Sequence, residues 1–115
     1  MTERVDIPPA LYDRLHQTAR QRGTAFYSEI APLLAIYTGD PYFGARVGRV
    51  LDDVNRAEHA AGRPLLSAVV IAKDTGMPGE GFFTCARNLK RYAGRDDLAY
   101  WVEELRRVHD YWSGR

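Results

Sequence analysis

Hydrophobic side chains recur every three to four positions through the first half of the chain, and glycine interrupts the pattern three times. Such spacing is typical of helices that bury one face, so the sequence predicts helices over residues 8–23, 28–39 and 40–62. The residues that favour these helix starts are Pro8 and Pro9 with Asp6 in capping range, Ser28 with Glu29, and Asp40 with Pro41. The closing glycines are Gly23, Gly39 and Gly62.

The third of these helices carries two distinct faces. The apolar stripe that we expect to be buried contains Val47, Leu51 and Val54. The opposite face carries Arg46, Arg49 and Arg56. These arginines suit contact with phosphate groups, but aspartates at a spacing of four also allow the surface ion pairs Arg49–Asp53 and Asp52–Arg56. The sequence leaves open whether this face binds an anion or is simply solvated.

The pattern then changes from helical to extended. Residues 65–72 are apolar, become β-branched toward their end and number only eight, which favours a strand. Residues 73–76 have the composition of a turn, and the glycine-rich segment 77–81 leads to the apolar pair Phe82 and Phe83. The joint prediction is a β-hairpin with Phe82 and Phe83 on its return arm.

Two helices are predicted to complete the chain. Thr84 is a suitable N-cap for the first, which Gly94 would end, and Asp96 is a suitable N-cap for the second. The stripe that we expect the last helix to bury contains Leu98, Trp101, Val102, Leu105, Val108 and Trp112.

The predicted order is three helices, a hairpin and two helices. The expected fold class is therefore α+β, in one helix-rich domain over residues 1–115. Three helices followed by a hairpin is the order of a winged-helix domain, in which a helix-turn-helix is followed by a wing. We accordingly expect a helix-turn-helix plus hairpin over residues 24–83 and a helical extension over residues 84–115.

Short motifs resemble a known family within this segment. Tyr27-Ser-Glu-Ile-Ala31, Ala45-Arg-Val-Gly-Arg-Val-Leu51 and Pro64-Leu-Leu-Ser-Ala-Val-Val70 resemble the DNA-binding domain of O6-alkylguanine alkyltransferases and alkyltransferase-like proteins. The resemblance spans residues 24–81 and implies a winged-helix fold with nucleic-acid binding.

The chain departs from that family at its functional positions. Leu65 and Leu66 stand where the family has its acceptor cysteine and activating histidine, so the resemblance implies no alkyl transfer. Ala45 stands where the family has the arginine that enters the base stack.

A second resemblance covers most of the chain. Gly62-Arg-Pro-Leu-Leu-Ser-Ala68, Met77-Pro-Gly-Glu-Gly-Phe-Phe83 and the tryptophans near the end resemble an uncharacterised bacterial family. That resemblance implies no chemistry.

The distribution of charge is more informative than its total. The formal net charge is only +1, which gives no overall indication of nucleic-acid binding. Residues 81–95 nevertheless contain basic side chains and no acid, whereas residues 96–112 are mainly acidic. This asymmetry suits an anionic partner or an oppositely charged protein. The side chains that we expect to contact nucleic acid are Arg46, Arg49, Lys73, Arg87, Lys90 and Arg91.

Catalytic and metal chemistry find less support. Cys85 is the single cysteine, so no internal disulfide forms, and with no secretion signal or membrane-length apolar run we expect a cytoplasmic protein without a membrane partner. Cys85 with His59 or His109 would be a candidate nucleophile pair, but a free cysteine is more often buried and inert. The histidines lack ligand spacing, so we expect no metal and no cofactor.

The leading expectation is a non-catalytic nucleic-acid-binding domain with DNA as its partner. The first alternative is a protein-interaction module or homodimer that uses the aromatic C-terminal helix. A small cysteine-dependent enzyme is the second alternative.

Overall fold

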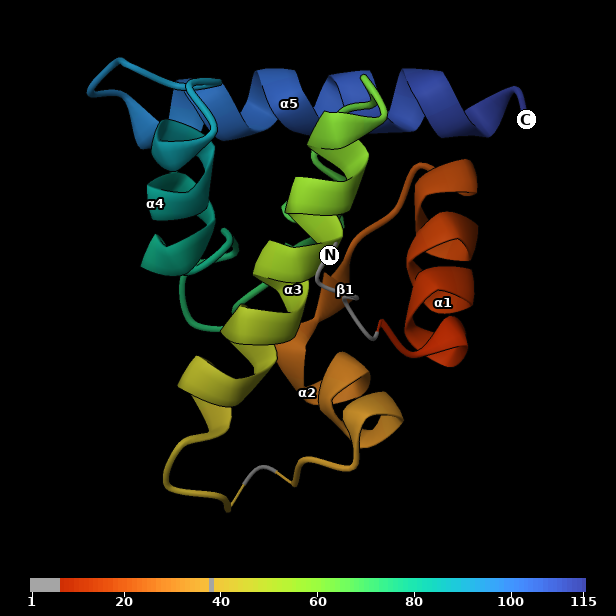
Figure 1. Cartoon of the computed structure of the whole chain (residues 1–115), viewed down its shortest axis with the longest axis vertical. Coiled ribbons are helices and arrows are strands. Elements are labelled where there is room, and N and C mark those ends of the chain that lie inside the picture. Colours follow the sequence, from red (N-terminus) through yellow and green to blue (C-terminus); the bar gives the residue numbers. More distant parts are fainter. Residues whose placement is uncertain (1–6, 38) are drawn as a thin grey trace, which may run out of the picture.

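Helices dominate the computed structural model, which describes residues 7–37 and 39–115 (Figure 1). The α-helices in this part of the chain are α1 (Pro9–Arg20), α2 (Tyr27–Ile30), α3 (Phe43–Ala60), α4 (Glu80–Asn88) and α5 (Asp97–Ser113). Two 3₁₀-helices accompany them, η1 (Ala31–Leu34) and η2 (Leu66–Val69). The strands are β1 (Ala25–Phe26) and β2 (Val70–Ile71), which pair in parallel. The expectation of a helix-rich fold with a small β element is confirmed.

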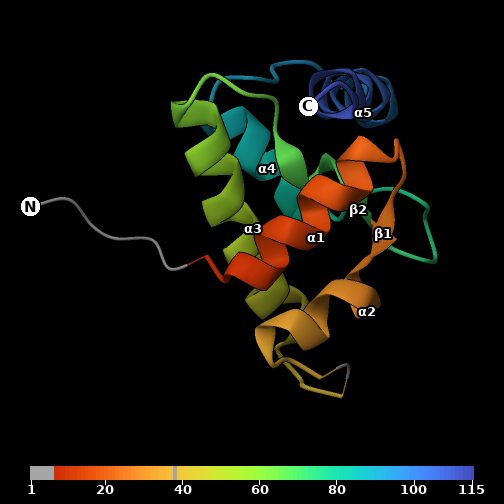
Figure 2. The ribbon, with the colours of Figure 1, turned by 90° about the vertical axis from the view of Figure 1, so that its right-hand side faces the viewer.

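The segment η2–β2 forms the centre of the molecule. Its residues from Leu65 to Val70 are almost completely buried. α1, α3 and α5 all pack against η2, and α5 lies across the ends of α1, α3 and α4 (Figure 1). Figure 2 shows α5 nearly end-on beside α1. One hydrophobic core thus draws on residues from Leu11 to Val108, and it includes the segments before and after residue 84.

The predictions for the first and third helices are confirmed. α1 begins at Pro9, while the expected cap Asp6 lies outside the described residues. α3 buries Val47, Leu51 and Val54 as expected but begins three residues after Asp40. The reason is local, because the Asp40 carboxylate accepts a hydrogen bond from the Tyr42 amide at 2.7 Å and closes a turn before the helix starts.

The predicted second helix is shorter and changes its winding. Four residues of α2 give way to η1, in which Pro32 occupies the first turn and supplies no amide hydrogen for an α-helical bond. Ala35 then adopts a left-handed conformation with φ of 57° and ends the helix.

The prediction of a β-hairpin is wrong. Within residues 65–72 the segment Leu66–Val69 forms the 3₁₀-helix η2, and the short strand β2 pairs with β1, where Ala25 lies opposite Val70. Phe82 and Phe83, expected on the return arm, lie in α4. Both are buried together with Cys85 and Ala86, a helical spacing that begins before the predicted cap Thr84. No wing is therefore present in the described residues, and the predicted order of elements does not hold.

α5 is capped as predicted but rotated. The Asp96 side chain accepts a hydrogen bond from the Ala99 amide at 3.0 Å. Leu98 and Val102 are 54% and 53% exposed, although we expected them to be buried. The cause is Glu104, which is fully buried and accepts hydrogen bonds from the Leu65 amide and from Arg91, so it turns its own face of α5 inward.

No helix among residues 7–37 and 39–115 has the length and apolar character needed to cross a membrane.

Candidate functional site

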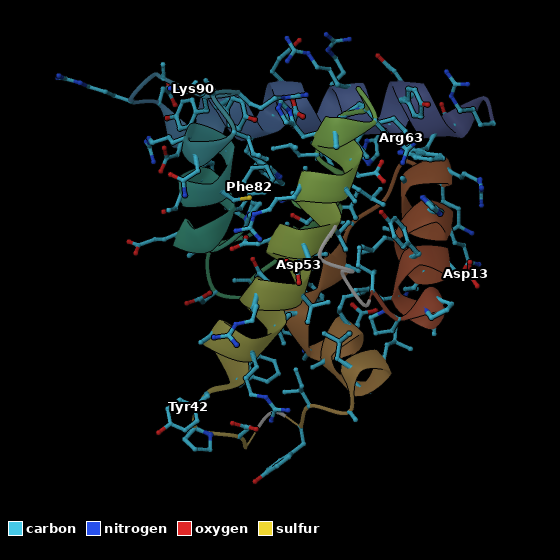
Figure 3. All side chains as sticks on the ribbon, viewed as in Figure 1. Asp13, Tyr42, Asp53, Arg63, Phe82 and Lys90 are labelled. Atoms are coloured by element: carbon cyan, nitrogen blue, oxygen red, sulfur yellow. The ribbon has the colours of Figure 1, made fainter. Side chains whose placement is uncertain are left out.

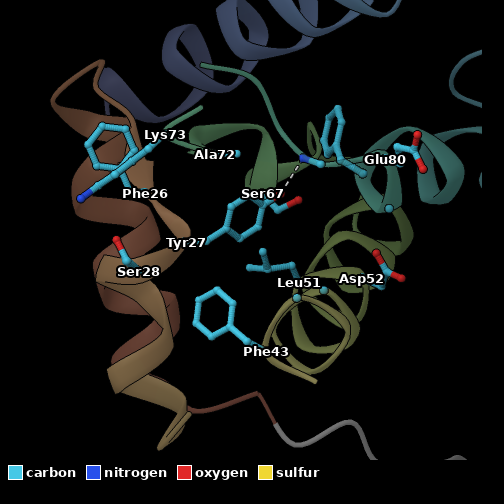
Figure 4. A pocket seen from close by; sticks show the side chains of 15 residues that line it. Phe26, Tyr27, Ser28, Phe43, Leu51, Asp52, Ser67, Ala72, Lys73 and Glu80 are labelled. Carbon is cyan, nitrogen blue, oxygen red and sulfur yellow. Dashed lines mark hydrogen bonds between the residues drawn. The ribbon is translucent and has the colours of Figure 1, made fainter. Parts of the chain in front are cut away.

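A cavity of about 500 Å³ opens between the β1–α2 segment and the first turns of α3 and α4 (Figure 4). Its surface is mostly apolar. The aromatic residues that line it are Phe26, Tyr27, Phe43 and Phe82. Sites for small molecules in proteins are typically concave, apolar and about 300–1,000 Å³ in volume, so this cavity has the size and surface of a ligand site.

Tyr27 joins the two sides of the cavity. It is the first residue of α2, and its hydroxyl oxygen accepts a hydrogen bond of 2.8 Å from the Gly79 amide, which lies just before α4 (Figure 4). Burial raises the pKa of Tyr27, so the phenol stays neutral. The hydrogen bond fixes the loop before α4 against α2 and thereby sets the width of the cavity.

Glycines leave space around the cavity. Gly44 and Gly48 lie one turn apart on α3, and Gly81 lies in the first turn of α4. A Cβ atom added at any of these three positions would meet no atom within 4 Å. Packing therefore does not require glycine at these positions. Glycine inside a helix costs about 0.5–1 kcal/mol relative to alanine, so Gly48 stabilises neither the helix nor its packing. The missing side chain at Gly48 leaves space in the cavity.

The charged groups of the cavity are Asp52, Lys73 and Glu80. Asp52 is partly buried, lies near the Cys85 thiol and forms no ion pair with any described residue. Burial raises the pKa of Asp52, and the nearby Arg56 guanidinium opposes that rise. Lys73 lies with its Nζ 5.2 Å from the centre of the Phe26 ring.

The one buried hydroxyl on the cavity surface is held by neighbouring polar groups. The Oγ atom of Ser67 accepts a 2.7 Å hydrogen bond from the Asn55 side-chain amide, and the Ser67 backbone amide donates to the same side chain. Both residues are buried. This exchange fixes η2 against α3 at the floor of the cavity.

The predicted arginine face lies beside the cavity. Arg46 pairs with Asp40, and exposed Arg49 has no ion pair among residues 7–37 and 39–115. Neither of the expected ion pairs, Arg49–Asp53 and Asp52–Arg56, is formed. Asp53 binds Arg56 at 3.0 Å instead. A shallow groove lined by Arg49 and Arg56 borders the cavity, and the residues common to both are Gly44, Gly48, Asp52 and Gly81.

The six predicted nucleic-acid contacts do not gather on one surface. Arg46 and Arg49 lie in the first half of α3, close to the exposed Tyr42, while Lys73 lies on the cavity. Of the other three, Arg87 lies in the last turn of α4, and Lys90 and Arg91 follow its end. Figure 3 shows Lys90 and Tyr42 at opposite ends of the molecule.

Two of the basic residues near the end of α4 are paired with acids of the helix that follows. Arg87 forms an ion pair of 3.3 Å with Asp97 and lies over the Tyr92 ring. Arg91 binds the buried Glu104 at 2.9 Å. These contacts give both arginines a structural role.

The expectation that Cys85 is buried is confirmed. Only 3% of it is exposed, and burial raises the pKa of its thiol to about 11. His109, a candidate partner, is hydrogen-bonded at 2.9 Å to the Gly23 carbonyl. Among the described residues no three histidines, cysteines or acids gather as a metal site would require.

Comparison with known proteins identifies no relative: no family model, no curated protein and no solved structure matches the chain.

The sequence patterns do not predict this cavity. They place Phe82 in a hairpin, include Tyr27 only in a family motif, and offer Arg56 as the partner of Asp52. A usable signal was the pair Gly44 and Gly48, since two glycines one turn apart inside a helix are unfavourable unless close approach or open space is needed.

Proposed function

We propose that the protein is a non-catalytic domain that binds a small ligand in the cavity between α2, α3 and α4. The observation that carries the proposal is the cavity itself, with a volume of about 500 Å³ and an aromatic lining. Desolvation of an apolar ligand body on these walls would supply affinity, and the few charged groups would fix its orientation.

The polar groups suit binding better than catalysis. No histidine or cysteine lines the cavity, and the Ser67 hydroxyl is bound to Asn55. Nucleophilic catalysis by serine needs an adjacent base, which Asn55 cannot provide. A cysteine-dependent enzyme is also disfavoured, because Cys85 is buried and burial raises the pKa of its thiol.

A fluorescence titration tests the proposal. The neutral dye N-phenyl-1-naphthylamine brightens in apolar surroundings, and we expect one saturable site on the wild-type protein. Gly48→Leu should weaken binding by roughly tenfold or more, since a clash worth about 1.4 kcal/mol already gives that factor. Its matched control is Ala60→Leu, at an exposed position at the end of the same helix.

Equal dye affinity in the wild type and in Gly48→Leu would contradict the proposal, because the dye would then bind elsewhere. Thermal unfolding of both variants checks that the fold is kept. Leucine favours a helix more than glycine does and only slightly less than alanine, so neither variant should unfold much earlier than the wild type.

Nucleic-acid binding is a second candidate, supported by one surface. Arg46 and Arg49 are exposed on adjacent turns of α3, and Tyr42, which is 70% exposed, lies on the same groove. Arginines beside an exposed aromatic ring suit phosphate contact with base stacking. The support comes from these side chains and not from a wing.

Substitution of that surface tests the second candidate. The double variant Arg46→Ala and Arg49→Ala should weaken DNA binding and flatten its salt dependence by roughly one unit per lost phosphate contact. The control is Arg20→Ala with Arg22→Ala, two exposed arginines at the end of α1. Wild-type affinity and salt slope in the first variant would exclude this surface as the binding site.

Contact with another protein has one supporting observation. Leu98 and Val102 lie one turn apart on the outer face of α5 and leave about half of their surface exposed. A homodimer through this face would show in light scattering and would be lost in Leu98→Ser with Val102→Ser.

A further inference from the structure

The charges of the cavity are separated in space. Asp52 and Glu80 lie at one side, from α3 and the first residue of α4, and Lys73 lies at the other (Figure 4). The Lys73 ammonium is near the Phe26 ring, so it does not pair with either acid. One side of the aromatic cavity therefore carries two carboxylates, and the basic residue of the cavity lining, Lys73, lies on the other side.

Asp52 lacks the partner that a partly buried carboxylate normally has. Transfer of a carboxylate out of water is costly unless a cation or several hydrogen bonds compensate. The closest basic side chain on its own helix face, Arg56, binds Asp53 at 3.0 Å instead. The Cys85 thiol is a weak donor and compensates little. Asp52 therefore has no direct ion-pair partner among the described residues.

Resting on the ligand-binding function proposed above, we infer that the ligand is an amine with an aromatic or other apolar body, whose ammonium group lies beside Asp52 and Glu80. The aromatic walls favour such a cation as well as its apolar body, because the faces of aromatic rings attract positive charge. An ammonium group would also provide the partner that Asp52 lacks.

An anionic ligand fits less well. Its charge would face Asp52 and Glu80, and Arg49 and Arg56 line the neighbouring groove and not the cavity. Lys73 is the one basic side chain on the cavity surface, on the side away from the acids.

Three indole compounds of the same body test the inference. Tryptamine carries an ammonium group, tryptophol a hydroxyl group and indole-3-propionate a carboxylate. We expect tryptamine to bind at least about tenfold more tightly than indole-3-propionate in calorimetric titration at neutral pH, with tryptophol between them, since about 1.4 kcal/mol of differential charge interaction gives that factor.

A second aspartate, remote from the cavity, supplies a matched variant. Asp52→Asn should reduce the affinity for tryptamine to that for tryptophol, whereas Asp13→Asn, at an exposed position of α1, should leave it unchanged. Glu80→Gln, at an exposed position, should reduce the preference for tryptamine without any risk to the core.

The outcomes separate this inference from the proposed function. If the three indoles bind the wild type equally and binding is lost in Gly48→Leu, the inference of an amine ligand is wrong but the cavity is still a ligand site. Preference for tryptamine that persists in both Asp52→Asn and Glu80→Gln would also overturn it. Absence of binding by all three compounds, together with absence of dye binding, would overturn both.

Discussion

At the scale of one residue, the burial of Cys85 disfavours a thiol-dependent activity. Burial raises its thiol pKa to about 11, so the thiol is almost entirely neutral at pH 8. Burial favours the neutral thiol, so reactivity should increase as pH approaches 11. Stopped-flow modification with a disulfide reagent should be far slower for the native protein than for the protein in urea. Equal rates in the two states would contradict the buried position of Cys85.

Two glycines allow a matched test of why α3 contains glycine. Gly48 lies inside the helix with free space around its Cα, so Gly48→Ala should stabilise the protein by about 0.5–1 kcal/mol. Gly62 also has free space but adopts φ of +74°, so Gly62→Ala should destabilise it. Urea unfolding measures both changes. A loss of stability in Gly48→Ala would mean that packing, and not the cavity, requires that glycine.

Elements with strong local signals were predictable from the sequence. α1, α3 and α5 each combine an apolar stripe with a suitable start, and all three occur close to the predicted positions. α4 was misplaced because Phe82 and Phe83 suit a strand as well as a helix, and burial against the core decides between the two. The 3₁₀ winding of η2 has no sequence signal, since that segment is buried on every side and shows no periodicity.

Glu104 fixes the rotation of α5, a feature that the apolar stripe did not predict. Its carboxylate accepts a 2.8 Å hydrogen bond from the Leu65 amide and binds Arg91 at 2.9 Å. Glu104→Ala should therefore cost about 3–5 kcal/mol, because a buried amide and a guanidinium lose their partner. Glu103→Ala, at an adjacent exposed ion pair, should change stability by about 0.5 kcal/mol or less. Similar values for the two variants in chemical unfolding would contradict this role of Glu104.

At the scale of the whole molecule, the cavity is made by segments that are far apart in the sequence. Phe26 belongs to β1, Tyr27 begins α2, Phe43 begins α3, and Phe82 belongs to α4. Sequence motifs describe neighbours along the chain, so they located the arginines of α3 correctly but could not show which aromatic residues meet. The predicted nucleic-acid residues were likewise separated by the fold, with Lys90 far from the start of α3 (Figure 3).

The central claim is that the cavity between α2, α3 and α4 holds a ligand, and amide NMR with ¹⁵N-labelled protein tests it most directly. Addition of tryptophol, which is neutral, should shift the amide signals of Tyr27, Gly48, Gly79 and Gly81 in a saturable manner, because these residues line the cavity on three sides. Gly48→Leu should abolish the shifts. Saturable shifts at Leu98 and along α5, or none at the cavity residues, would contradict the account.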